Sequence, residues 1–183
     1  MRPREELTGR TAAREAAPVA GPRTLAEIDW ARWTGVLCTL VFVVRGEDVL
    51  LIRKKRGLGA GKINGPGGRF EPDESPLACA VREVREEVCA VPRGLVWCGR
   101  NRFHFADGYA TDVHVFRASA LEGEPAATDE ADPFWTPIAK VPYAEMWSDD
   151  ALWLPHLFAG RRFSGRFLFD GDALLDWALE LID

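Results

Sequence analysis

Two stretches of the chain, residues 37–44 and 49–53, are rich in apolar and β-branched side chains. A short polar segment, residues 46–48, separates them, so the pattern predicts two strands joined by a tight turn. Residues 95–105 and 109–118 alternate between apolar and polar side chains, which is the two-residue period of a half-buried strand. These four stretches predict the main part of a sheet.

The second half of the chain carries shorter signals. Residues 134–135 begin a short apolar run and residues 163–169 form a longer one, and both favour strands. Residues 142–147 and 150–159 have the spacing of helices. The tail after residue 172 suits a strand by its alternation and a helix by a second spacing, and we expect a strand.

One segment has clear helical periodicity. Its apolar residues recur at steps of four and three, at Leu77, Val81, Val84 and Val88. Ser75 supplies a hydroxyl for the N-cap, and Pro76 suits the first helical position. Strands interleaved with a few helices predict an α/β fold, a three-layer α/β/α sandwich with a mixed sheet.

We assign this domain to residues 34–183. Residues 1–33 differ from it, because they are rich in Ala, Arg, Pro and Glu and contain no aromatic residue before Trp30. We expect them to form a flexible N-terminal extension. A targeting peptide is a weaker alternative, since the acidic residues offset the arginines.

The amino-acid composition argues against several classes of function. The 183 residues, 47% of them hydrophobic and 28% charged, suit one globular domain with a sizeable core. The net charge of −5 argues against a broad nucleic-acid surface, and no apolar run reaches the roughly 18 residues of a membrane span. The four cysteines form no CxxC pair, which is typical of reduced thiols. We expect a cytoplasmic monomer that has no nucleic-acid or membrane partner.

Three glutamates of the predicted helix, Glu83, Glu86 and Glu87, stand at i, i+3 and i+4 and cluster opposite the apolar stripe. Their mutual repulsion weakens an isolated helix. A divalent cation would turn the repulsion into attraction, and hard oxygen ligands suit Mg²⁺. Arg82 precedes Glu86 by four residues, which predicts an orienting ion pair. The alternative is a solvated acidic helix face.

A fixed spacing joins this helix to the glycine-rich residues 57–72. Gly68 is followed by five residues, Glu74, seven residues, and then Arg-Glu-Val-Arg-Glu-Glu at 82–87. The pattern resembles the signature box of the Nudix hydrolases, which cleave nucleoside diphosphates linked to another moiety. The resemblance implies the Nudix fold, with catalytic roles for Arg82 and the three glutamates.

One position departs from the box. Cys89 stands where the family has glycine, at a position that suits a left-handed helix cap. A side chain there is strained by roughly 1 kcal/mol. A modified cap that leaves the metal site intact is the simpler interpretation, and a damaged box with reduced activity is the alternative.

Further segments resemble one subgroup, the oxidised-purine nucleoside triphosphatases of the MutT-homologue (8-oxo-dGTPase) type. They are residues 54–65, 112–116, 146–150 and 163–169. The resemblance extends over about residues 36–182. It implies hydrolysis of oxidised purine nucleoside triphosphates, such as 8-oxo-dGTP and 2-hydroxy-dATP, to the monophosphate and pyrophosphate, which would cleanse the nucleotide pool and prevent DNA damage.

The subgroup implies that Asn64, Asp149 and Asp150 read the purine edge. Asparagine offers a donor and an acceptor, and two adjacent acids in a pocket cannot easily both ionise, so one can keep a proton. A pair of acids with one donor and one acceptor can read an oxidised guanine. A proton shifted within the pair would let it read an oxidised adenine. The alternative is that both aspartates serve the N-terminus of the helix at 150–159.

Other contacts follow from the same resemblance. Trp147 is implied as a stacking platform for the base, with core packing as the alternative. Thr39 and Lys54 match substrate-contacting positions, although an ordinary strand residue and a surface charge explain them equally well. The phosphates are expected over Gly67 and Gly68.

Leu58, Ile63 and Pro66 stand where the subgroup has aromatic residues in the loop, and these substitutions leave the base preference open. Phe103 and Phe105 either line the pocket or fill the core.

The implied chemistry is metal-assisted hydrolysis of a small nucleotide, with Mg²⁺ as the cofactor and Mn²⁺ as a substitute. The resemblance adds the Gly67 carbonyl and the Glu130 carboxylate to the three glutamates as metal ligands. Either Glu86 or Glu87 would activate the water. Two other readings stay open: a Nudix pyrophosphatase with another nucleotide substrate, and a non-catalytic nucleotide-binding module that kept the fold.

Overall fold

The computed structural model describes residues 5–10 and 21–182. The main sheet of this part of the chain has the strand order β1-β11-β10-β6-β7-β2-β3-β4, and β9 also pairs with β3. Its strands are β1 (Glu5–Arg10), β2 (Val36–Arg45), β3 (Asp48–Lys54), β4 (Ile63–Asn64), β6 (Val96–Phe105), β7 (Ala110–Ala118), β9 (Ala131–Pro137), β10 (Arg162–Asp170) and β11 (Ala173–Ile182). A second sheet pairs β5 (Val91–Arg93) with β8 (Ala120–Glu122).

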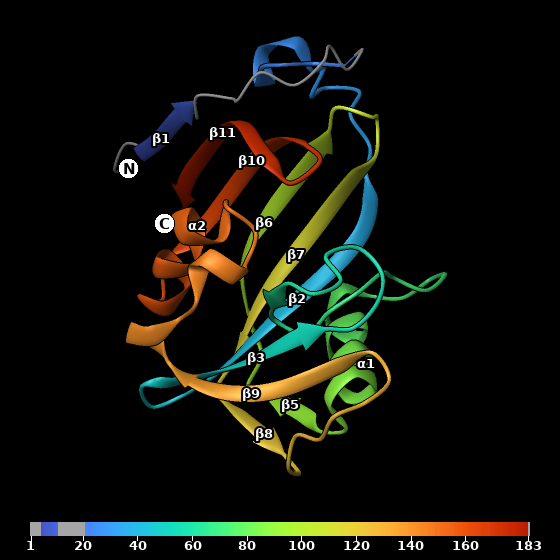
Figure 1. The fold of residues 1–183 in the computed structure, drawn as a ribbon, viewed down its shortest axis with the longest axis vertical. Helices are drawn as coiled ribbons and strands as arrows, with labels where there is room; N and C mark the ends of the chain where they lie inside the picture. Colours follow the sequence, from blue (N-terminus) through green and yellow to red (C-terminus); the bar gives the residue numbers. More distant parts are fainter. Residues whose placement is uncertain (1–4, 11–20, 183) are drawn as a thin grey trace.

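The main sheet is mixed. β2 runs parallel to β7 and β10 runs parallel to β6, whereas the other neighbouring strands of the described sheet pair antiparallel. Helices α1 (Pro76–Val88) and α2 (Asp150–Phe158) lie on opposite sides of it (Figure 1). This confirms the predicted α/β fold with a mixed sheet.

Each helix closes its own hydrophobic core. Ala80, Val84 and Val88 of α1 pack with one set of β2 and β3 side chains, among them Val41 and Leu50. Trp153, Leu154 and Leu157 of α2 pack with the other side chains of β2 and β3 and with aromatic residues of β6 and β10. Because successive strand residues point to opposite faces, the same strands feed both cores, and the three-layer sandwich follows.

Helix α1 begins and ends as its sequence predicts. The Ser75 hydroxyl accepts a 3.2 Å hydrogen bond from Ala78 N, and Pro76 is the first helical residue. Cys89 caps the C-terminus with φ 58° and ψ 23°, a left-handed conformation. The predicted apolar stripe is only partly buried, because Leu77 is 52% exposed.

Several elements differ from the predicted ones. Residues 142–147 are not a full helix but contain a short 3₁₀ turn, Tyr143–Glu145. The strands β4, β5 and β8 have two or three residues each and carry too little periodicity to be predicted. The tail after residue 172 is a strand, as expected, and residues 150–158 are helical.

The segment before residue 34 is described in part. Strand β1 pairs antiparallel with β11. Arg23 forms a 2.9 Å ion pair with Asp170, and Trp33 Nε1 donates to His104 Nδ1 over 3.3 Å. Residues 1–4 and 11–20 of the predicted flexible extension lie outside the described residues, and the boundary at residue 34 stays a prediction. No helix in the described part of the chain is long and apolar enough to cross a membrane.

Candidate active site

A pocket of about 560 Å³ opens between the glycine-rich loop, β6, β7 and the N-terminus of α2. Nearly all the residues singled out in the sequence line it. Those residues are Thr39, Lys54, Asn64, Gly67, Gly68, Glu83, Glu87, Glu130, Trp147, Asp149 and Asp150. Arg82 and Glu86 do not line it.

The two glycines of the loop permit close approach. A Cβ atom on Gly67 would lie 2.1 Å from the carbonyl oxygen of Thr39, and one on Gly68 would lie 2.3 Å from Oε2 of Glu83. Gly67 N also donates a 2.8 Å hydrogen bond to Oε2 of the buried Glu87. Side chains at either glycine would therefore separate the loop from β2 or from α1.

Cations hold the helix carboxylates. Lys54 Nζ lies 3.2 Å from Glu87 Oε1, and Arg82 Nη1 lies 2.8 Å from Glu83 and 3.0 Å from Glu86. The ion pair between Arg82 and Glu86 confirms the predicted one. Burial raises the pKa of Glu83 and that of Glu87, and the neighbouring cations oppose the rise.

The prediction that all three glutamates lie opposite the apolar stripe is wrong for Glu87, which is 2% exposed and accepts a hydrogen bond from Gly67 N. Glu86 is on the exposed side as predicted, since its side chain is 48% exposed, and it does not line the pocket. Glu83 and Glu87, which are about 40° apart around the helix, line the pocket together. The metal role of Glu86 stays a prediction.

Other charged groups surround the same region. Arg56, which lines the pocket, forms an ion pair with Glu130, and Lys55 N donates to the Glu130 carbonyl over 2.8 Å. Arg69 also lines the pocket and donates to the Tyr109 hydroxyl over 3.2 Å. Lys54, Arg56 and Arg69 supply the local positive charge that an acidic protein needs to bind a polyanion.

A divalent cation needs several oxygen ligands in one place. Among the described side chains, no three acidic, cysteine or histidine groups converge closely enough to hold a metal. The donor chemistry does fit, because the carboxylates of Glu83, Glu87 and Glu130 line one pocket and are hard oxygen ligands. Lys54, Arg82 and Arg56 form ion pairs with Glu87, Glu83 and Glu130 respectively.

The second functional group of the pocket is the aspartate pair. Asp149 and Asp150 are 1% and 2% exposed. Asp149 Oδ2 accepts a 2.8 Å hydrogen bond from Trp153 Nε1, and its Oδ1 has no partner among the described residues. Asp150 Oδ2 accepts from Trp147 N over 3.0 Å. The Asp149 carboxyl makes no cap hydrogen bond, so the helix-capping alternative does not explain it.

Burial controls the charge of this pair. It raises the pKa of Asp149 to about 7, and the Trp153 hydrogen bond opposes the rise. It also raises the pKa of Asp150, with the charge of Asp149 as the second cause. Two adjacent buried acids cannot easily both ionise, so one of them can keep a proton, and the pair then offers a donor as well as acceptors.

Aromatic side chains form the apolar wall. The Trp147 ring lies 6.1 Å from that of Phe105 and 5.5 Å from that of Phe169, edge to face in both cases. Phe103 and Phe105 both line the pocket and also pack on the core, so the two interpretations hold together. Asn64 Oδ1 accepts from Gly65 N over 2.8 Å, which fixes the carboxamide beside the wall.

Sequence reasoning missed several lining residues. They are Cys38, Leu40, Arg56, Arg69, Tyr109, Thr111, Val113 and Phe169. Phe169 was detectable in principle, because it lies near the end of β10, whose alternate residues Phe163 and Phe167 are buried in the same core. Thr111 depends on the parallel pairing of β2 with β7, which brings distant residues together and leaves no local signal.

Comparison with known proteins agrees with this site. The NUDIX domain family model matches residues 34–157. The oxidized purine nucleoside triphosphate hydrolase of Danio rerio is 42% identical over 153 residues, which cover 82% of this chain and 98% of that protein. Its Mus musculus counterpart is 38% identical over 152 residues, covering 82% and 97%. The solved MutT protein from Bacillus halodurans superposes with a TM-score of 0.71 at 27% identity, covering 79% and 97% of the two chains.

Proposed function

The chain belongs to the Nudix family, and from this premise we propose that it hydrolyses oxidised purine nucleoside triphosphates to the monophosphate and pyrophosphate. The single observation that carries the proposal is the buried Asp149–Asp150 pair, which lines the same pocket as Gly68 and Glu87. A plain phosphate site has no need for two buried acids beside an indole. The names of the relatives from Danio rerio and Mus musculus support the same substrate class.

The base is held by polar and aromatic groups of the chain. A proton kept by Asp149 or Asp150 would let the pair donate one hydrogen bond and accept another at the purine edge. The Asn64 carboxamide supplies a second donor and acceptor. Trp147 offers its ring for stacking, a contact worth roughly 1–3 kcal/mol per base in other proteins. Oxidation changes the donor and acceptor pattern of the purine, so these groups can select for it.

The phosphates are held by the loop and the cations. Lys54, Arg56 and Arg69 line the pocket and offset phosphate charge. The close approach of Gly67 and Gly68 to β2 and α1 leaves room for the phosphate chain over the loop. Arg82 does not reach the pocket, so its role is to orient Glu83 and Glu86, both of which it contacts.

Nudix hydrolases generally use a divalent metal, and we propose that Mg²⁺, or Mn²⁺ in its place, is held by Glu83, Glu87 and Glu130 with the Gly67 carbonyl, and by Glu86 if its side chain turns inward. When bound, the ion neutralises phosphate charge and lowers the pKa of water. A glutamate would accept the proton of the attacking water, whose oxygen bonds to phosphorus while the P–O bond between the monophosphate and the pyrophosphate breaks and pyrophosphate leaves. The pocket position of Glu87 favours it over Glu86 as this base.

The test is pyrophosphate release from 8-oxo-dGTP, 2-hydroxy-dATP, dGTP and dATP with and without Mg²⁺. We expect metal-dependent release, with the oxidised purines preferred. Equal rates on all four would keep the Nudix chemistry and remove the substrate claim. No release from any of them would revive the damaged box at Cys89 or the non-catalytic module. Removal of damaged nucleotides by a cytoplasmic monomer, without a nucleic-acid partner, is part of the same proposal.

A further inference from the structure

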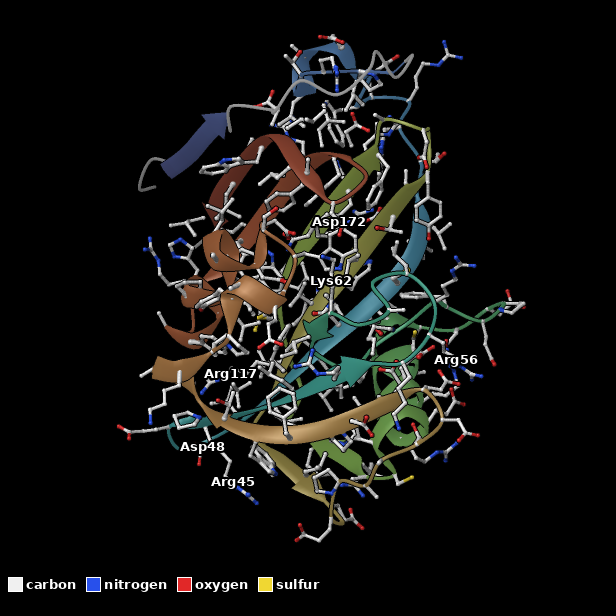
Figure 2. All side chains as sticks on the ribbon, viewed as in Figure 1. Arg45, Asp48, Arg56, Lys62, Arg117 and Asp172 are labelled. Atoms are coloured by element: carbon white, nitrogen blue, oxygen red, sulfur yellow. The ribbon has the colours of Figure 1, made fainter. Side chains whose placement is uncertain are left out.

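Lys62 connects three segments that lie far apart in the sequence. It is the last residue of the glycine-rich loop before β4. Its Nζ atom lies 4.8 Å from the centroid of the Trp147 ring and 2.9 Å from Oδ2 of Asp172, which is in the turn between β10 and β11 (Figure 2). The loop, the segment before α2 and this turn therefore meet at one ammonium group.

The backbone of Lys62 is fixed. Lys62 N donates to Gly59 O over 2.9 Å, and Lys54 N of β3 donates to Lys62 O over 3.0 Å. The loop itself rests on the indole, since a Cβ atom on Gly59 would lie 3.0 Å from Trp147 Nε1. An ammonium group on this anchored backbone has little freedom, and its side chain is 24% exposed.

Lys62 lies outside the pocket wall. Trp147 and Asp150 line the pocket, whereas Lys62 does not. The ammonium therefore contacts the indole without occupying the space that a purine would fill. Its charge also reaches the aspartate pair, because it lowers the pKa of Asp150 against the larger effect of burial.

We propose that Lys62 is a positioning residue for the purine base, which holds the Trp147 indole from outside the pocket and is itself held by Asp172. The inference rests on the proposed function, because it assigns a role in base recognition within that site. Asp172 is 73% exposed, and exposed ion pairs contribute little, so the contact with the ring is the larger part of the effect.

The experiment compares K62M, K62R and D172N with the wild-type protein, and it uses K140M at an exposed lysine as the matched control. K62M keeps the length and the apolar stem and removes the charge. We expect it to raise KM for 8-oxo-dGTP about two- to fivefold, with kcat changed less than about twofold, because the base is held less well while the phosphates are not affected. K62R should restore KM, and D172N should raise it by a smaller factor that vanishes at high salt.

The design separates this inference from the proposed function. Each protein is also titrated calorimetrically with 8-oxo-dGMP and dGMP, which need no turnover. If wild-type protein hydrolyses 8-oxo-dGTP and K62M matches it in KM, Lys62 has no positioning role and the function stands. If wild-type protein does not hydrolyse 8-oxo-dGTP, the function fails, and a two- to fivefold weaker binding of 8-oxo-dGMP by K62M still supports Lys62. Equal monophosphate affinities, or no binding by the wild-type protein, would overturn the inference.

Discussion

Trp153 donates its indole N–H to Asp149 over 2.8 Å from one turn further along α2. The bond turns one carboxylate oxygen into the helix and leaves the other, which is buried, without a partner among the described residues. A buried oxygen of this kind costs free energy unless a ligand satisfies it. The relationship explains how an acid at the start of a helix can serve the pocket instead of the helix.

Asp149→Asn tests the charge state of the pair through stability. The pKa of Asp149 in the folded protein is raised to about 7 by burial, so the folded state holds a proton that the unfolded state loses near pH 4. The wild-type protein therefore loses unfolding free energy as the pH rises from about 4 through about 7. The variant lacks this titration and should gain stability relative to the wild type over that range. Urea unfolding of both proteins at pH 5, 7 and 8.5 measures their unfolding free energies. A difference between the two proteins that stays constant with pH would refute the raised pKa of Asp149.

Glu87→Gln tests the acidic part of the pocket. The neutral amide can still accept from Gly67 N, so the fold should persist with a melting temperature near that of the wild type. Turnover should fall on the order of 100-fold or more, because the variant loses a metal ligand and the proposed base. Steady-state kinetics at saturating Mg²⁺ measure it, and a kcat near the wild-type value would remove Glu87 from the mechanism.

Cys89→Gly tests the unusual cap. Cys89 has a φ of 58°, which is left-handed, so glycine relieves strain there. We expect the unfolding free energy to rise by about 0.5–1 kcal/mol, after the larger unfolded-state entropy of glycine is included. Chemical denaturation checks the value. A lower stability would mean that the Cys89 side chain contributes more than its strain costs.

Gly68→Ala and Gly67→Ala form a matched pair. The Cβ of the first meets the end of the flexible Glu83 side chain, and the Cβ of the second meets the backbone carbonyl of Thr39. The first variant should fold normally and lose activity by about tenfold or more, because Glu83 is pushed aside. The second should lose stability. Equal melting temperatures for the two variants would contradict the geometry.

Local sequence patterns predict much of this fold. The α1 cap at Ser75, the left-handed Cys89 and the long strands were predicted, because each depends on neighbouring residues or on a two-residue period. The short strands β4, β5 and β8 were not, because two or three residues carry no period. The 3₁₀ turn at Tyr143–Glu145 replaced a predicted helix in a segment that contains Pro142.

The site was predicted unevenly for a related reason. Glu83 and Glu87, which belong to a fixed spacing, line the pocket together with Asp149 and Asp150, and their roles there stay predictions. The burial of Glu87 was not predicted, because a helical wheel does not say which side of the helix the sheet will cover. Tertiary contacts such as that of Lys62 with Trp147 have no signal in the sequence at all.

The central claim is that the aspartate pair selects the oxidised base. The most direct measurement is the ratio of kcat/KM for 8-oxo-dGTP to that for dGTP, taken in the wild-type protein and in Asp149→Asn. We expect a wild-type ratio of about ten or more, since one or two hydrogen bonds distinguish the bases, and a ratio near one in the variant. A wild-type ratio near one, or a high ratio that the variant retains, would contradict it.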